Sequence, residues 1–217
     1  MALTRSTGTQ VAIASTYGTA SNITAITNAS EAVATLEAGH GVTVGDLLEI
    51  TSGWGLLNGR IVRVRTVATN AVTLEGVNTT STASYPAGSG TGSVRRITAW
   101  TSLSQIKKDG GISSEGGEAK FAPASTIDDE DDKEVPDGRT AMKINITVFD
   151  DPSLPWYSVV RAAADGGLPV AMRLTYKNGS RTLANGYWSM PEMPDSAAIL
   201  ESTLSFSAAA RVTRYTS

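Results

Sequence analysis

The residues in this sequence best suited to chemistry form one acidic run. Between Ile127 and Val135 the chain carries one ammonium group, on Lys133, and six carboxylates, on Asp128, Asp129, Glu130, Asp131, Asp132 and Glu134. Carboxylates at this density can bind a metal ion or perform acid–base catalysis. They can also stay in water and face another surface. The spacing of the residues decides among these three roles.

The spacing argues against a metal site and against a catalytic pair. A calcium-binding loop alternates its oxygen ligands around a turn that contains a glycine, and this run lacks that alternation. The two carboxylates of a glycoside hydrolase come from separate elements on either side of a groove, not from one contiguous run. Like charges keep such a run extended and solvated. We therefore predict a solvated loop without a metal ion or a cofactor.

The remaining candidates for catalysis are weak. His40 is the only histidine, which weakens any Ser-His-Asp arrangement, and its place between Gly39 and Gly41 favours a turn residue. The chain has no cysteine, which excludes thiolate nucleophiles, disulfides and cysteine metal sites. The glycine-rich stretch at residues 88–93 lacks the lysine of a phosphate-binding loop. We expect the protein not to be an enzyme.

Composition restricts the partners. The chain has 217 residues and a formal net charge of −3, with its basic residues scattered along the sequence. A protein that grips DNA needs clustered Lys and Arg to release counterions from the phosphates. No run approaches the ~18 apolar residues of a membrane span, and the first residues lack the apolar core of a signal peptide. We expect neither tight DNA binding, nor membrane contact, nor secretion by that route.

Alternating patterns predict most of the elements. In residues 140–149, Ile144, Ile146 and Val148 alternate with polar residues, and residues 202–214 show the same period of two. Residues 168–188 read as two strands joined at Asn178-Gly179, a dipeptide that favours a type I′ hairpin turn. These three segments predict an antiparallel sheet that has one solvated face.

One helix is expected over residues 152–165. Asp151 can cap its first turn, Pro152 fits that turn, and Gly166-Gly167 can end it. Trp156, Val160 and Ala163 then share one face, suited to covering a sheet. The predicted fold class is all-β with one α-helix.

The middle of the chain has short strands and frequent glycine turns. Its motifs are Gly39-His40-Gly41, Gly45-Asp46, Leu57-Asn58-Gly59-Arg60 and Thr73-Leu74-Glu75-Gly76-Val77. In this order they resemble a module recurrent in tailed-bacteriophage virion proteins and similar to the first catalytic-cysteine half-domain of ubiquitin-activating enzymes. The chain departs from that pattern in its last loop, which has Ala-Gly-Ser-Gly-Thr-Gly instead of paired glycines. Ubiquitin chemistry is not implied, because the chain has no cysteine.

The flanking segments resemble, in their layout, the major tail tube proteins of long-tailed, siphovirus-type bacteriophages. The resemblance implies a β-sandwich or barrel core formed by residues 1–22 and 95–217. This core would include an N-terminal arm, an acidic loop at residues 109–139 and the helix at residues 152–165. Residues 23–94 would form a small β-barrel module inserted into it.

The same resemblance implies a structural subunit of the virion tail, assembled in the host cytoplasm. Copies would form stacked, hexameric rings around a channel that holds the tape measure protein and later passes DNA without specific binding. Tail terminator and baseplate or tip proteins would be further partners. Residues 128–134 would lie at a contact between subunits or rings, or at the lumen, and pair with basic residues of a neighbour.

Two other classes of function remain open from the residues. The first is a tail-tip or adhesin-type virion protein that binds a carbohydrate or a receptor, against which the low aromatic content speaks mildly. The second is a hydrolase with a carboxylate pair, for which the sequence offers no organised site.

Overall fold

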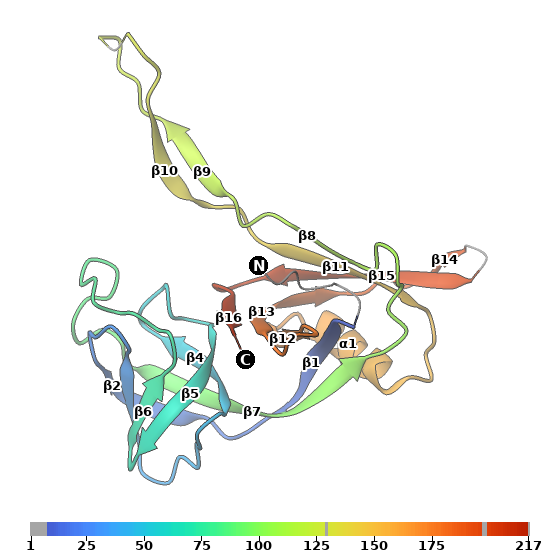
Figure 1. Cartoon of the computed structure of the whole chain (residues 1–217), viewed down its shortest axis with the longest axis horizontal. Coiled ribbons are helices and arrows are strands. Elements are labelled where there is room, and N and C mark those ends of the chain that lie inside the picture. The colour runs from blue at the N-terminus through green and yellow to red at the C-terminus, as the bar shows by residue number, and fades with distance from the viewer. Residues whose placement is uncertain (1–7, 129, 197–198, 217) are drawn as a thin grey trace.

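The computed structural model describes residues 8–128, 130–196 and 199–216. Over these residues the chain is mostly strand with one helix, α1 (Pro155–Gly166), which confirms the predicted all-β class. Figure 1 shows a β-barrel, a second β-layered body and a long projecting arm. The strands are β1 (Gln10–Tyr17), β2 (Ser21–Ile26), β3 (Val33–Leu36), β4 (Leu47–Ser52), β5 (Ile61–Ala68), β6 (Ala71–Leu74), β7 (Gly92–Leu103), β8 (Ile112–Glu115), β9 (Ala119–Pro123), β10 (Glu134–Arg139), β11 (Lys143–Phe149), β12 (Val170–Thr175), β13 (Arg181–Ser189), β14 (Asp195–Ser196), β15 (Leu200–Ala208) and β16 (Thr213–Tyr215).

The first half of the chain closes into a barrel. Its strands follow the order β2-β3-β6-β5-β4-β7, and the pairing of β2 with β7 closes the ring, so none of these strands is left as an open edge. Trp54 fills its interior, with its ring 5.2 Å from that of Tyr85 and its Nε1 donating to the Pro86 carbonyl at 2.8 Å. Apolar residues of the strands form most of the rest of this core, including Leu36, Leu48, Ile50, Val62 and Leu74, and Leu57 adds to it from the loop between β4 and β5.

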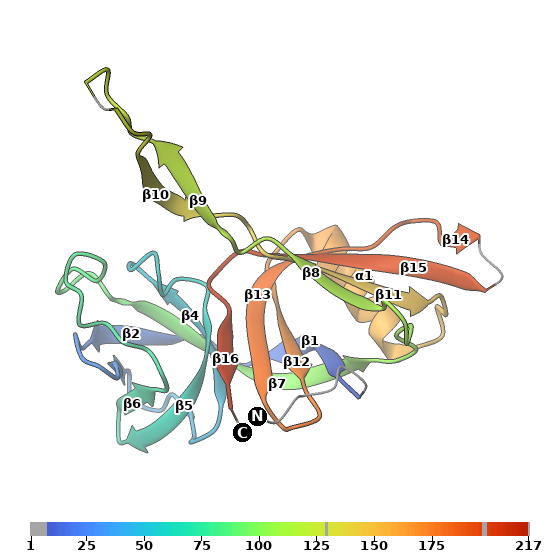
Figure 2. The ribbon, with the colours of Figure 1, turned by 45° about the horizontal axis from the view of Figure 1, so that its top comes forward.

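The second half forms the main body. Its strands continue from the barrel in the order β7-β1-β12-β13-β15-β11-β8, and the sheet curls so that two layers enclose one core. Figure 2 shows β11 and β15 on one side of this body and β1, β7 and β12 on the other. Ile144, Ile146 and Val148 point into the core, as their spacing predicts. Trp188 and Phe206 pack edge to face there, with ring centroids 5.3 Å apart.

The helix α1 covers one opening of this core and differs from the prediction at its start. Its buried residues are Trp156, Val160 and Ala163, the face that the sequence indicates. It begins at Pro155 and not at residue 152, because the Oδ1 atom of Asp151 accepts the N–H and the hydroxyl of Ser153 in a separate turn before the helix. Leu154 is therefore the N-cap residue. The helix ends before Gly167, whose φ of 58° is left-handed.

The hairpin between β12 and β13 is also closed differently from the prediction. Gly179 has a φ of 82°, but Asn178 does not have a positive φ, so the turn is not type I′. The Gly179 N–H donates to the Tyr176 carbonyl, and the Tyr176 N–H donates to the Ser180 carbonyl, both at 2.9 Å. This pattern is a longer hairpin loop with a glycine bulge, and it keeps the expected pairing of the two strands.

The segment expected as a loop over residues 109–139 contains three strands. β8 adds to the edge of the main sheet beside β11, and β9 and β10 pair only with each other. The β9–β10 hairpin, with the turn between its strands, is the arm that Figures 1 and 2 show projecting away from both the barrel and the main body. The alternation of apolar and polar residues that marks buried strands is missing here because most side chains of both strands are exposed.

The barrel and the main body share β7 and a buried junction. β7 pairs with β2 and β4 in its first half and with β1 in its second, so it crosses the expected boundary between residues 94 and 95. Glu49 of β4 is only 7% exposed, and its carboxylate accepts Asn185 Nδ2 of β13 at 3.0 Å and Arg95 Nη2 at 2.6 Å. These contacts fix the barrel against the main body.

Two tyrosines at this junction are expected to make the folded protein less stable at alkaline pH. Burial raises the pKa of Tyr17, which accepts the Ala171 N–H, and also raises the pKa of Tyr215, which accepts the Arg63 N–H. A raised pKa in the folded state means that the neutral phenol is favoured there. The stability that each neutral phenol contributes to the folded state is complete below about pH 10, and it is lost as the pH rises through the folded-state pKa.

We therefore expect the free energy of unfolding, measured with urea between about pH 8 and pH 11, to fall steeply above about pH 10. A Tyr17→Phe, Tyr215→Phe variant should be less stable at neutral pH, because two buried N–H groups lose their acceptor. Its stability should decline less steeply in alkali than that of the unmodified chain. An equally steep decline in both proteins would show that these phenols are not responsible.

Candidate functional site

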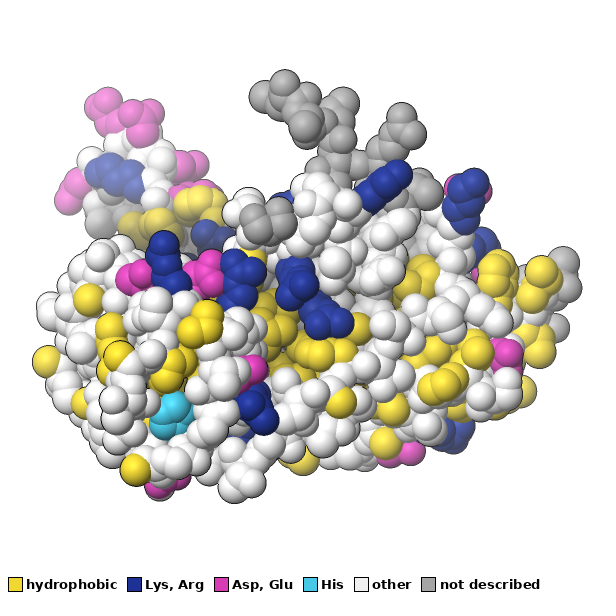
Figure 3. All heavy atoms as spheres, turned by 60° about the horizontal axis from the view of Figure 1, so that its bottom comes forward, with side chains coloured by type: hydrophobic (Ala, Val, Ile, Leu, Met, Phe, Trp, Pro, Cys, Tyr) yellow, Lys and Arg dark blue, Asp and Glu magenta, His cyan; other side chains and the backbone are white. Residues whose placement is uncertain are grey.

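The acidic run lies at the end of the arm. Asp128, Glu130, Asp131, Asp132 and Lys133 are in the turn between β9 and β10, Glu134 is the first residue of β10, and all are exposed. Asp129 lies outside the described residues. Figure 3 shows acidic side chains gathered at the end of the arm, at the upper left. The run is therefore carried far from the rest of the chain.

The turn is held by its backbone, and the acidic residues that the structure describes in it are exposed. The Ala124 N–H donates to the Lys133 carbonyl at 2.8 Å, and the Lys133 N–H donates to Ser125 Oγ at 2.7 Å. Among the residues that the structure describes, no group of acidic residues and His has the arrangement of a metal site. What this arrangement can do is present a dense negative charge to another molecule.

The arm also exposes apolar side chains. Phe121 is 55% exposed, Val135 is 50% exposed, and Ile127 is fully exposed beside the acidic run. An isolated two-stranded hairpin is marginally stable in water, because it has no core of its own. Exposed apolar groups on such an element indicate that it is completed by contact with a partner.

A basic groove lies at the base of the arm, and sequence reasoning missed it. The groove has a volume of about 560 Å³, and Arg60, Arg139 and Arg211 line it together with Leu56, Met142 and Val212. Its arginines come from the barrel, from the end of β10 and from the segment after β15. Because they are so far apart in the sequence, only the folded chain brings them together. We call it the basic groove below.

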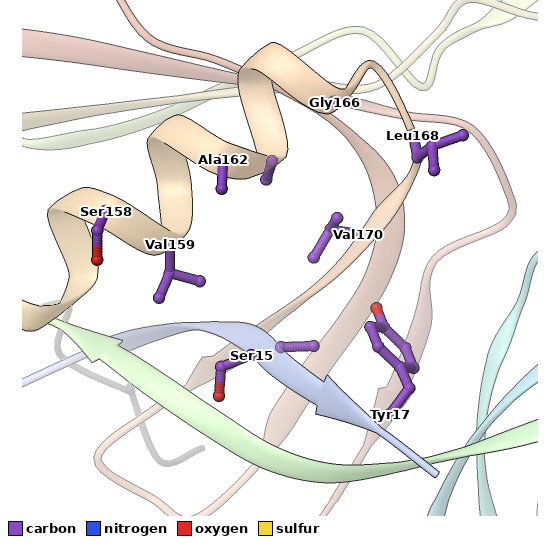
Figure 4. A pocket seen from close by; sticks show the side chains of 10 residues that line it. Ser15, Tyr17, Ser158, Val159, Ala162, Gly166, Leu168 and Val170 are labelled. Carbon is purple, nitrogen blue, oxygen red and sulfur yellow. The ribbon is translucent and has the colours of Figure 1, made fainter. Parts of the chain in front are cut away.

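A second groove is apolar and lies beside α1. Figure 4 shows Val159, Ala162 and Leu168 on one side of it and Tyr17 at one end. It has a volume of about 420 Å³ and is lined mainly by apolar atoms. The Tyr17 hydroxyl accepts the Ala171 N–H at 2.9 Å, just beyond the last paired residues of β1 and β12, Ile13 and Met172.

The outward face of β8, β11 and β15 is polar and balanced in charge. Thr147 and Thr203 share a hydrogen bond of 3.2 Å, Ser205 donates to Asn145 Oδ1 at 2.9 Å, and Lys143 stands opposite Glu115. β8 ends the order of the main sheet, so its outer backbone edge is unpaired within the described chain. An unpaired edge can accept a strand from another molecule.

The other residues singled out by the sequence have structural roles. His40 lies in a turn, where its Nδ1 accepts the Val42 N–H and its Nε2 is 3.0 Å from the Thr69 carbonyl. Arg63 and Arg65 lie on the outside of the barrel, and each forms an ion pair, with Glu75 and Glu31 respectively. Trp54 and Trp156 are core residues, and Trp100 lies under the Arg173 guanidinium.

A comparison with models of protein families gives a match to this chain. A family model described as "Phage tail tube protein, TTP" matches residues 52–217, from the end of β4 to the end of the chain. No curated protein matches the chain. Within the described residues, no helix has the length and apolar content needed to cross a membrane.

Proposed function

Because the chain belongs to the phage tail tube protein family, we propose that its copies assemble head to tail into stacked rings that form the channel for DNA ejection. Membership makes the protein a structural component of the virion tail. The proposal adds that each ring is a hexamer, as the resemblance described above implies. Assembly would take place in the host cytoplasm.

The observation that carries the proposal is the projecting arm. A hairpin with an acidic end, with Phe121, Ile127 and Val135 exposed and without a core of its own, is an element built for contact with another molecule. If the arm of one copy contacts a different surface of the next copy, the contact is heterologous. Such contacts continue without limit along an axis unless a rotation closes them.

The unpaired edge of β8 supports closure into a ring. Strand pairing between copies would extend the main sheet from one subunit into the next, which also removes an edge that would otherwise favour aggregation. The charge-balanced face formed by β8, β11 and β15 suits the wall of such a channel. Its described residues present hydroxyl and amide groups, and they include no cluster of Lys and Arg that would hold phosphates. We assign this face to the lumen, where the tape measure protein would lie before DNA passes.

The barrel supports an outward position for residues 23–94 as an inserted module. Its strands close on themselves through the pairing of β2 with β7, so it offers no free edge for ring formation. In the proposed tube it would project from the outer wall, in keeping with its resemblance to the ubiquitin-activating half-domain module. Residues 1–22 and 95–217 would then build the tube itself. Its two ends would contact the tail terminator and the baseplate or tip proteins.

The acidic run gives a direct test of assembly. Asp128→Asn, Glu130→Gln, Asp131→Asn and Asp132→Asn, combined in one chain, should weaken assembly at low salt, because four charges that attract a basic neighbour are removed. The fraction of protein pelleted by ultracentrifugation should fall steeply with salt for the unmodified protein and much less steeply for the variant. Equal pelleting of both proteins at every salt concentration would contradict a role of the run in assembly.

A further inference from the structure

The geometry points to a receptor for the arm. We propose that the basic groove of one copy binds the end of the arm of a second copy, with Ile127 among the apolar lining and the neighbouring carboxylates on the arginines. This inference rests on the proposed tube function and deepens it, because it names the surface on which the next subunit docks. The occupant is a second copy of this chain, which carries both halves of the contact.

The groove is short of negative charge. None of the ion pairs among the described residues involves Arg60, Arg139 or Arg211. The Nε atom of Arg60 is buried without a hydrogen-bond acceptor, and its Nη2 reaches only the Thr213 hydroxyl, at 3.3 Å. Burial lowers the pKa of Arg60, and the charge of Arg211 lowers it further. A carboxylate in the groove would accept hydrogen bonds from the exposed Arg139 and Arg211 and offset the repulsion between Arg60 and Arg211.

The residues that line the groove are chemically complementary to those at the end of the arm. Besides its three arginines the groove has apolar walls made by Leu56, Met142 and Val212 and by the alanines at positions 208–210. The end of the arm carries an apolar side chain and negative charge, since the fully exposed Ile127 directly precedes the acidic residues. One docking event would therefore bury an apolar side chain and pair several charges.

The arm of a copy leads away from its own groove. Arg139, which lines the groove, is the last residue of β10, and the acidic end lies at the opposite end of the hairpin (Figures 1 and 2). Extended residues from Ala119 to Asp128 can span about 30 Å, at about 3.3 Å per residue. A second copy displaced along the arm by that length would place its groove at the end of the first arm. Repetition of this step builds an open stack.

Two charge-reversed chains test the contact. The first changes Asp128, Glu130, Asp131 and Asp132 to Lys, which gives it a basic arm and a basic groove. The second changes Arg139 and Arg211, both exposed, to Glu, which gives it an acidic arm and an acidic groove. Each chain alone should remain as single rings or smaller species in electron micrographs and in sedimentation velocity, because like charges meet at every stacking contact.

Mixed in equal amounts, the two chains should form stacks that approach the length of those of the unmodified protein, since each arm then meets a groove of opposite charge. A control chain with Arg161→Glu and Lys177→Glu carries the same charge change as the second chain but away from the groove, and it should stack normally.

Stacking by either reversed chain alone would overturn the proposal, as would failure of the mixture to stack. If the unmodified protein forms neither rings nor stacks, the proposed function itself fails, which is a distinguishable result.

Discussion

Replacing residues 119–139 by an Asn-Gly turn should abolish stacking of the protein and leave its fold intact. The replacement fits the backbone, because the Thr140 N–H already donates to the Glu118 carbonyl at 3.0 Å, as in a hairpin closed by a short turn. The removed strands pair only with each other and contribute no residue to either hydrophobic core. We therefore expect the chain to fold without the arm but to lose the proposed contact between rings.

The shortened chain should melt within a few degrees of the full chain and give the same near-ultraviolet circular dichroism. In sedimentation velocity it should remain at the size of a ring or smaller at concentrations at which the full chain forms long particles. Long particles formed by the shortened chain would show that stacking depends on another surface. A large fall in melting temperature would instead show that the arm supports the fold.

The second large effect is expected at Trp156, the residue that joins α1 to the core. Its side chain is 0% exposed, and its Nε1 is buried without an acceptor. Trp156→Ala should lower the free energy of unfolding by about 3–5 kcal/mol, because a large cavity replaces the indole. Trp156→Phe should cost clearly less, since it keeps much of the ring while it removes an N–H group that has no partner.

Urea unfolding of the three proteins separates these effects. The midpoint should fall far for Trp156→Ala and only slightly for Trp156→Phe, with similar slopes if both remain two-state. A Phe variant as unstable as the Ala variant would mean that the Nε1 group has a favourable partner, such as a buried water. Variants that keep the fold should also keep the ability to assemble.

The sequence predicts best those elements in which one face is buried. Ile144, Ile146 and Val148 alternate because one side of β11 meets the core, and Trp156 and Val160 recur at a helical spacing for the same reason. β9 and β10 lack this signal, because neither strand packs against a core. The sequence therefore predicts a loop where the structure has the arm, although the acidic residues at its end are evident from the sequence.

Local side-chain contacts explain two smaller errors. Asp151 does form hydrogen bonds at its own turn, with Ser153, but the helix begins only at Pro155, where the fixed φ of proline suits the first position. At Asn178-Gly179 the loop places only the glycine in the left-handed region. Both sequences are compatible with either arrangement, and the surrounding packing selects one of them.

The basic groove shows what a sequence without its fold cannot indicate. Arg60, Arg139 and Arg211 are isolated cations in the sequence, whose scattered basic residues argue against tight DNA binding but do not locate a basic groove. The fold brings these three to one place because the loop after β4, the end of β10 and the segment after β15 meet at the base of the arm. The acidic run could be recognised from its composition, but its complement could not.

Electron microscopy of the concentrated, purified protein tests the central claim most directly. The account predicts hollow tubes of stacked rings, in which helical reconstruction places density for the arm of each subunit in the basic groove of a subunit in the adjoining ring. A protein that remains monomeric at millimolar concentration, or tubes in which the arms point freely into solvent, would contradict it.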